Sequence, residues 1–302
     1  MIFLKVILPI FIIIGVGYFF EKVKSPDFKS ISDLTLYFLT PCLIFEGLLK
    51  SHENISSFVP KAIFFMILLT LLLWLLSTIT GYFMKLDFME KSALSLATVM
   101  MNTGNFGIPL IMFAFGDKGL TYAIIILVMF TFPLGTLAVF IASRGKSSIK
   151  KSLLEIVRVP LFHSILIAVV FKYFNITLPQ LIMKPLIIMG EAAIPALLIL
   201  LGMQLARTDL KTNFKPIAGS CVIRLLISPI IAFFLCLLLN IHGMPAKILI
   251  IQTSTPSAII PLLYSINYNT RPDIVAGTIF FSTIFSAVTL TILMYILGVN
   301  VL

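Results

Sequence analysis

Apolar positions along the chain fall into long runs separated by short polar segments. Each run has about the 20 residues that a helix needs to cross a bilayer core. Stretches such as 68–76 and 124–130 lack the alternation of apolar and polar positions that a transmembrane β-barrel requires, so the pattern predicts helices. The fold class is therefore an all-α integral membrane protein, with ten helices expected at 2–20, 30–49, 59–84, 90–114, 119–142, 153–174, 179–205, 215–240, 245–267 and 272–298.

The composition excludes a water-soluble protein. Of the 302 residues, 60% are hydrophobic and 11% are charged, whereas soluble domains are about 45–50% apolar and about 25% charged. A soluble enzyme and a nucleic-acid binder are both excluded, because in a membrane protein Lys and Arg first set orientation, even at a net charge of +10. Cys42, Cys221 and Cys236 show no CxxC spacing and no nearby histidine cluster, so neither a metal site nor a cofactor is expected.

Basic residues concentrate in the loops on one side of the expected helices, around residues 22–29, 85–91, 144–151 and 207–215. The positive-inside rule places these loops in the cytoplasm. The protein is thus expected in the plasma membrane as a multi-pass protein, with loop 143–152 cytoplasmic and both termini outside. The first run, 2–20, is followed by no small-residue cleavage pattern, so we expect it to be kept as the first helix.

The two halves of the chain show a weak internal repeat. Sliding residues 1–150 over 151–302 aligns Pro41 with Pro195 and Pro109 with Pro261. Each copy would hold five helices, an odd number, so the second copy would run through the membrane upside down relative to the first. Inverted repeats of this kind are typical of secondary transporters. The alternative is a chance alignment in a chain with 16 prolines.

The fourth and ninth expected helices are both interrupted by helix-breaking residues. Non-helical backbone at membrane depth must be buried in protein or line a polar cavity, and a matched pair of interrupted helices is the strongest pointer to a transport site. Second half-helices that begin near Asn105 and Ser257 would aim N–H groups at the centre, where a carboxylate is the natural ligand, and the carbonyl ends of the first half-helices could hold a cation. The alternative is two proline kinks without a ligand. The candidate substrate-binding residues are Asn102, Thr103, Asn105, Ser254, Pro256 and Ser257, and the candidate crossing residues are Gly104, Gly107, Pro109 and Pro261.

Ionisable residues inside membrane helices are functional candidates. Glu46 either reaches the outer interface or takes part in coupling, and Glu191 is a candidate for protonation during transport. Arg224 lies inside the eighth helix, where it either reaches the cytoplasm, pairs with a carboxylate or binds substrate. Sodium-coupled relatives of this inverted-repeat architecture often use a carboxylate on the ninth helix, and none lies between Lys247 and Tyr268, so uniport or proton coupling is preferred over sodium coupling.

Two stretches resemble motifs of the auxin efflux carrier family, which includes plant auxin carriers and short-loop microbial permeases. Asn102-Thr103 followed by Gly107-Ile108-Pro109-Leu110 is similar to the fourth-helix motif, and 256–261 with 267–274 is similar to the ninth. The resemblance implies a scaffold of helices 1, 2, 6 and 7 and a transport domain of helices 3–5 and 8–10 that moves as an elevator. It also places Asn102 and the prolines Pro109, Pro256 and Pro261 at the substrate carboxylate.

These features together predict a secondary transporter rather than an enzyme, since the chain has no HExxH, no GxSxG and no paired intramembrane Asp. The expected substrate is a small organic anion such as malate, malonate or an auxin-like acid, carried by alternating access. The alternatives are a sodium- or proton-coupled cation/anion exchanger on the same fold, a channel and a receptor. The expected partners are this anion and the lipid bilayer, and a homodimer stays open.

Overall fold

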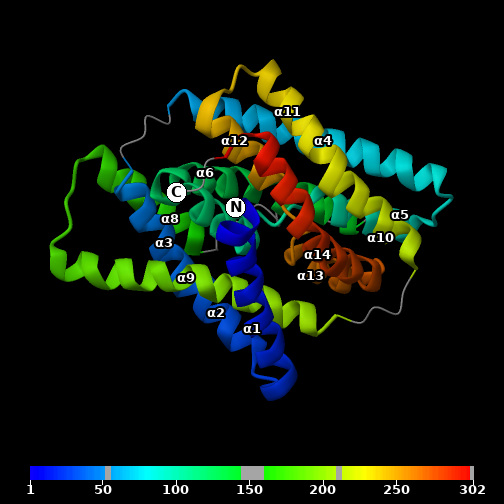
Figure 1. Ribbon diagram of the computed structural model, residues 1–302, viewed down its shortest axis with the longest axis horizontal. Helices are drawn as coiled ribbons and strands as arrows, with labels where there is room; N and C mark the ends of the chain where they lie inside the picture. The colour runs from blue at the N-terminus through cyan, green and yellow to red at the C-terminus, as the bar shows by residue number, and fades with distance from the viewer. Residues whose placement is uncertain (52–55, 144–159, 209–212, 300–302) are drawn as a thin grey trace.

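The computed structural model describes residues 1–51, 56–143, 160–208 and 213–299, and these residues are almost entirely helical (Figure 1). Seven helices among them are long and apolar enough to cross a membrane. Three of the shorter helices, Phe88–Val99, Gly243–Thr253 and Ile260–Asn267, adjoin breaks within expected helices 4 and 9. The loop expected in the cytoplasm, 143–152, lies outside the described residues after Ser143.

The helices follow the apolar runs. The first half contains η1 (Phe3–Ile7), α1 (Leu8–Lys24), α2 (Phe28–Leu34), η2 (Thr35–Leu39), α3 (Thr40–Leu49), α4 (Phe58–Phe83), α5 (Phe88–Val99), η3 (Thr103–Gly107) and α6 (Ile108–Ser143). The second half contains α8 (Pro160–Tyr173), α9 (Gln180–Ala206), α10 (Phe214–Val222), η4 (Ile223–Ile227), α11 (Ser228–Leu238), α12 (Gly243–Thr253), α13 (Ile260–Asn267) and α14 (Pro272–Ile296). Within α6 the chain turns at Gly116, whose φ of 62° suits a residue without a side chain.

Four of these elements, η1 to η4, are short π-turns, and each ends two residues before a proline. The prolines are Pro9, Pro41, Pro109 and Pro229. A proline has no N–H to donate, and its ring clashes with the carbonyl four residues earlier. In η1, η2 and η4 the residue just before the proline instead bonds the carbonyl five residues back. The wider turn admits the proline while the membrane helix continues.

A first helix group consists of α1, α2, α3, α8 and α9, which pack on one another. Glycine makes the closest contacts possible: a Cβ at Gly17 of α1 would overlap the Ile199 carbonyl, and a Cβ at Gly202 of α9 would overlap the Ile14 carbonyl. Small residues at such positions let membrane helices pack through their backbones. The guanidinium of Arg207, the residue that caps the end of α9, adds an ion pair of 2.7 Å with Glu21 of α1.

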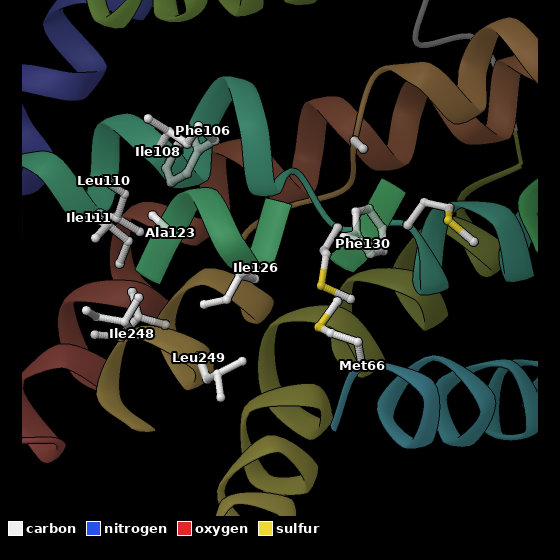
Figure 2. Close-up of a cluster of buried hydrophobic side chains, with 14 of the residues drawn as sticks. Met66, Phe106, Ile108, Leu110, Ile111, Ala123, Ile126, Phe130, Ile248 and Leu249 are labelled. Atoms are coloured by element: carbon white, nitrogen blue, oxygen red, sulfur yellow. The ribbon is translucent and has the colours of Figure 1, made fainter. Parts of the chain in front are cut away.

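A second helix group consists of α4, α5, α6 and α10 to α14, most of which lie at the upper right of Figure 1, away from α1, α2, α3 and α9. Its core is apolar. Figure 2 shows side chains from η3 and α6 facing side chains from α12, and the labelled residues of these elements are fully buried or nearly so. This packing holds the second part of the first interrupted helix against the first part of the second one.

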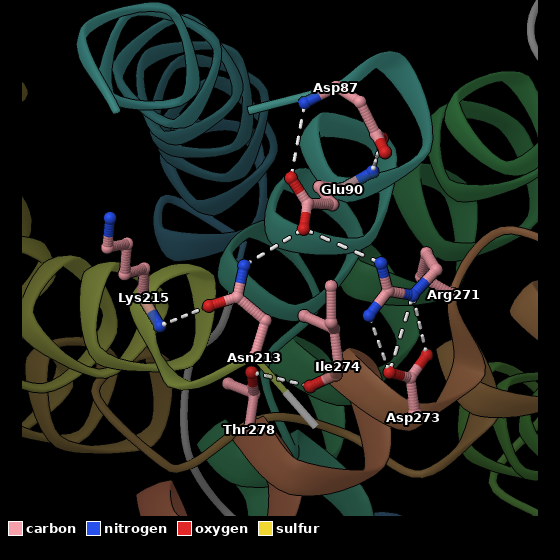
Figure 3. A network of polar contacts seen from close by, with 8 residues as sticks. All are labelled: Asp87, Glu90, Asn213, Lys215, Arg271, Asp273, Ile274 and Thr278. Carbon is pink, nitrogen blue, oxygen red and sulfur yellow. Dashed lines mark hydrogen bonds and ion pairs between the residues drawn. The ribbon is translucent and has the colours of Figure 1, made fainter. Parts of the chain in front are cut away.

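A polar network ties three helix N-termini of the second group together (Figure 3). The Glu90 carboxylate at the start of α5 accepts a hydrogen bond of 2.9 Å from the Asn213 amide, which caps α10. It also lies 3.5 Å from the guanidinium of Arg271, the residue before α14. Arg271 pairs with Asp273 at 2.8 Å, and this hydrogen bonding raises the pKa of the Arg271 guanidinium. The network lets α5, α10 and α14 hold a fixed arrangement at this end.

Candidate functional site

The two interrupted helices meet at their breaks. The first break, residues 100–102, separates α5 from η3, and the second break, residues 254–259, separates α12 from α13. The Asn102 N–H donates to the Pro256 carbonyl at 2.8 Å, and the Ala258 N–H donates to the Met100 carbonyl, also at 2.8 Å. Met101 and Ser257 thereby form an isolated antiparallel bridge. We call this paired backbone the crossing. It satisfies polar groups that neither broken helix could satisfy alone.

Asn102 is held at the crossing by both its backbone and its side chain. Its Oδ1 accepts a hydrogen bond of 3.3 Å from the Phe106 N–H, so Asn102 caps η3, and its carbonyl accepts one of 2.9 Å from Gly107. A side chain on Gly107 would come within 2.9 Å of Gln252 Cγ, so the close approach requires glycine. Asn102 is only 4% exposed, and no hydrogen-bond partner is described for its Nδ2. A buried amide with two unused donors is costly unless something else accepts from it.

Asn102 lines a cavity of about 460 Å³ beside the crossing. The polar residues of the wall are Asn102, Thr103 and Asn105 at the start of η3, together with Tyr37, Thr40, Thr131 and Tyr264 around the rest of it. The first turn of η3 also leaves N–H groups without intrahelical partners. Every residue of the wall is uncharged, and most are apolar, among them Leu36, Leu127, Phe130, Phe162, Ile165, Leu197, Ile260 and Leu263. The cavity therefore joins a cluster of amide donors at η3 to a mostly apolar wall that also carries four hydroxyl groups. Its walls come from both helix groups, with η2, α3, α8 and α9 on one side and η3, α6 and α13 on the other.

The predicted binding residues of the second break do not line the cavity, in contrast to those at the first break. Ser254, Pro256 and Ser257 are buried and lie outside the cavity wall, which Ala258, Ile259 and Ile260 line instead. The Ser257 hydroxyl donates to the Ala97 carbonyl at 2.6 Å, and the Ser257 N–H donates to the Ser282 hydroxyl at 3.1 Å. These bonds keep Ser257 out of the helix, so the second half-helix begins at Ile260 rather than near Ser257.

Pro109 is buried in α6 directly after the π-turn η3, and Pro261 is buried in the first turn of the half-helix α13. Proline is tolerated in that first turn because the N–H it lacks would have no intrahelical partner. Gly104 is half-buried and lines the cavity. The glycine and proline pattern therefore marks where each half-helix restarts.

Arg224 is fully buried beside the crossing, on the side of η4. It neither reaches the surface nor pairs with a carboxylate among the residues that the structure describes. Its Nη1 donates to the Thr98 carbonyl at 3.0 Å, and its Nη2 donates to the Ser228 hydroxyl at 2.6 Å and to the Thr253 carbonyl. Thr98 lies in the last turn of α5, and Thr253 is the last residue of α12. One guanidinium thus bonds the carboxyl ends of both broken helices.

The two candidate carboxylates lie away from the cavity wall. Glu46 on α3 is buried and forms an ion pair of 2.5 Å with Lys50 one turn later. Glu191 lies on an exposed face of α9. A role for either in coupling stays a prediction.

Gln252 has a more central place than its sequence position suggests. It is fully buried in the last turn of α12, and its Nε2 donates 3.0 Å hydrogen bonds to the Thr103 and Ala123 carbonyls. It therefore joins α12 to η3 and α6. In the sequence, the sign of this role is a glutamine at the end of an otherwise apolar run, close to the break.

Comparison with known proteins agrees with this architecture. Residues 2–294 match the family described as membrane transport protein. The chain belongs to this family. An uncharacterized transporter of Methanocaldococcus jannaschii is 29% identical over 310 residues, which cover 98% of this chain and 99% of that protein. An uncharacterized transporter of Methanothermobacter thermautotrophicus is 28% identical over 298 residues, or 95% of each chain.

Auxin efflux carrier component 1 of Arabidopsis thaliana is 27% identical over 129 residues, which are 42% of this chain and 20% of the plant protein. The relation to auxin efflux carriers that the motifs indicated is thus confirmed. As a member of a membrane transport family with several membrane-length helices, the chain is a multi-pass membrane protein.

Proposed function

We propose that the protein is a secondary transporter of a small organic anion, and that the anion's carboxylate binds at Asn102. The observation that carries this proposal is the unpartnered Asn102 Nδ2, buried at the wall of the cavity beside the crossing. A carboxylate accepts hydrogen bonds and has no donor of its own when ionised, which matches a site made of amide N–H groups. The free N–H groups and the positive dipole end at the start of η3 would also attract an anion.

The cavity favours one kind of acid among those expected. Its amide donors gather at 102–105, and the rest of the wall is apolar apart from the hydroxyls of Tyr37, Thr40, Thr131 and Tyr264. The Thr40 and Thr131 hydroxyls already donate to backbone carbonyls about one turn earlier. An acid with one carboxylate and an apolar body would satisfy both parts. A dicarboxylate such as malate or malonate would place its second charge against a wall without any charged side chain, which costs free energy. We therefore rank an auxin-like monocarboxylate above the dicarboxylates.

For the movement we propose a scaffold made of the first helix group and a transport domain made of the second, arranged as two inverted repeats of five helices at 1–150 and 151–302. The contacts between the groups support sliding, since they include apolar pairs such as Phe11 of α1 against Phe106 of η3, with ring centroids 6.2 Å apart. The polar bonds described above instead join helices of the same group. We further propose plasma-membrane insertion with both termini outside, and a homodimer through the scaffold.

The second candidate function is a sodium- or proton-coupled exchanger on the same fold. Glu191 favours it, because a carboxylate on an exposed face of a membrane-length helix is a site where protonation would change the energy of moving through the membrane. A requirement for sodium, or a response to pH in the absence of any acid, would distinguish this function from anion uniport.

The test measures binding of indole-3-acetate, malonate and malate to purified protein by thermal shift, and uptake of the binding acid into proteoliposomes. A ligand that binds only the folded state raises the unfolding midpoint. We expect indole-3-acetate to give the largest shift. We expect Asn102→Asp to weaken binding by at least about tenfold, since hydrogen bonds to charged groups contribute about 1.5–3 kcal/mol and a new negative charge repels the anion.

Asn102→Asp is the sharper variant because it keeps an oxygen that accepts from the Phe106 N–H, so the cap on η3 survives. Asn102→Ala removes the cap as well as the donor. Asn267→Ala, at an exposed position of α13, is the matched control and should bind like the wild type. Wild-type affinity in Asn102→Asp would refute the assignment of the carboxylate site.

A further inference from the structure

Arg224 is a buried positive charge whose described partners are all neutral. The guanidinium contacts two backbone carbonyls and one hydroxyl, from Thr98, Thr253 and Ser228, and the side chain is fully buried. An isolated charge is very costly to bury unless it is compensated. The charge of Arg224 must therefore be compensated by the partial negative charges of the groups that it contacts.

The two carbonyls belong to helix carboxyl ends. The last turn of a helix leaves carbonyls without intrahelical donors and carries a partial charge of about −0.5. Because α5 and α12 both end beside Arg224, their two ends together supply about −1, which balances one guanidinium. Without this cation, two like partial charges would face each other at the crossing and repel.

Other carbonyls of these two ends accept from hydroxyl groups of the second break. The Ala97 carbonyl accepts from the Ser257 hydroxyl, and the Ile250 carbonyl accepts from the Ser254 hydroxyl. The Ser228 hydroxyl, one turn after Arg224, also approaches the Thr253 carbonyl at 3.4 Å. Protein donors therefore surround both helix ends, and Arg224 supplies the positive charge among them, although its own Nε has no described partner. The π-turn η4, which precedes Pro229, positions that cation.

We propose that Arg224 is a positioning residue that acts as a built-in cation: it holds the crossing together where a bound metal ion would otherwise be needed. The anion site at Asn102 would then form without sodium. This second step rests on the proposed transport function, whereas the structural role of Arg224 does not. Arginine suits the role because its planar guanidinium stays charged and donates in several fixed directions at once, whereas a lysine ammonium acts as a point charge.

The experiment is chemical rescue of Arg224→Ala, measured by thermal unfolding in a choline buffer free of sodium. We expect the variant to unfold at a lower temperature than the wild type. Guanidinium chloride at low millimolar concentration, far below the denaturing range, should raise its midpoint, and urea, a neutral molecule of the same shape, should not. Gly17→Ala, which destabilises the protein by overpacking and removes no charge, is the matched control and should show no rescue by guanidinium.

If Arg224→Ala cannot be purified, the proposal is tested by comparing the thermal unfolding midpoints of the wild type, Arg224→Lys and Arg224→Met. A cation role predicts that the Lys variant is more stable than the Met variant. The proposal would be overturned if guanidinium gave no rescue, or if urea rescued as strongly as guanidinium. It would also be overturned if the Met variant were at least as stable as the Lys variant.

The transport function is judged separately, by whether any acid stabilises the wild type. If an acid does so equally in choline and in sodium buffer, the anion site forms without sodium, as proposed. If stabilisation by that acid requires sodium, the built-in cation does not replace a bound one. If no acid stabilises the wild type, the proposed function fails, and the rescue experiment still decides the structural role of Arg224.

Discussion

At the scale of single residues, the Glu90 side chain joins the N-terminal ends of three helices, α5, α10 and α14. Its carboxylate accepts from Asn213 and lies within ion-pair distance of Arg271. We expect Glu90→Gln to lower stability by about 1 kcal/mol, because hydrogen bonds to charged groups are strong but the Arg271 side chain is 35% exposed, so solvent screens the pair. That corresponds to a fall of a few degrees in the thermal midpoint in detergent.

Asp33→Asn, at an exposed position of α2, is the control for Glu90→Gln and should leave the midpoint unchanged. An equal midpoint for Glu90→Gln and wild type would mean that water replaces the network without loss. In that case the fixed arrangement of α5, α10 and α14 would depend on apolar packing alone.

The sequence predicts the role of a residue when that role depends on its neighbours in the chain. Asn102 could be identified because it lies among the glycines and proline that break its own helix. The partners of Arg224 could not be identified in this way: Thr98 and Thr253 are 126 and 29 positions away, and only folding brings them to the guanidinium. Glu191 lies near the middle of an apolar run, yet its exposure depends on which face of α9 packs inward.

At the scale of helices, the contact between α1 and α9 depends on glycine at particular positions. A Cβ at Gly17 would overlap the Ile199 carbonyl, whereas a Cβ at Gly15 would meet nothing within 4 Å. We expect Gly17→Ala to destabilise the protein by about 1–3 kcal/mol through overpacking. Gly15→Ala, on the same helix, should be neutral or stabilise by up to about 1 kcal/mol, because alanine favours the helical conformation.

Thermal or denaturant unfolding of the two glycine variants in one detergent gives the comparison. Equal effects would show that α1 shifts to make room, and that the backbone contact is not what holds α1 against α9. The comparison is independent of any substrate.

The positions of the helices were largely predictable, but some of their boundaries were not. Apolar runs place α4 and α14 within a few residues, because a membrane helix must satisfy its own backbone over the bilayer thickness. The end of α5 before the first break also follows from local sequence. The start of α13 does not, since it is delayed by the bond between the Ser257 N–H and Ser282, a residue of α14. The π-turns had a local signal, the proline two residues after each.

At the scale of the whole molecule, the proposed elevator movement requires the two helix groups to slide past each other. Phe11 of α1 and Phe106 of η3 touch across the groups, with ring centroids 6.2 Å apart. Phe58 of α4 and Tyr122 of α6 touch within the second group, with centroids 5.1 Å apart. Cysteine pairs at these two contacts, in a background without Cys42, Cys221 and Cys236, allow each contact to be locked by a short, cleavable bis-thiol reagent.

We expect cross-linking of the Phe11→Cys/Phe106→Cys pair to stop uptake into proteoliposomes and cleavage of the linker to restore it, because the locked groups cannot exchange the two orientations of the site. Cross-linking of the Phe58→Cys/Tyr122→Cys pair should leave uptake near its level before the reagent, since both residues would move together. The radiolabelled acid that stabilises the wild type most is the substrate for both. Continued uptake through the linked Phe11/Phe106 pair would exclude sliding at this contact and favour a smaller gating movement of the half-helices around a fixed crossing.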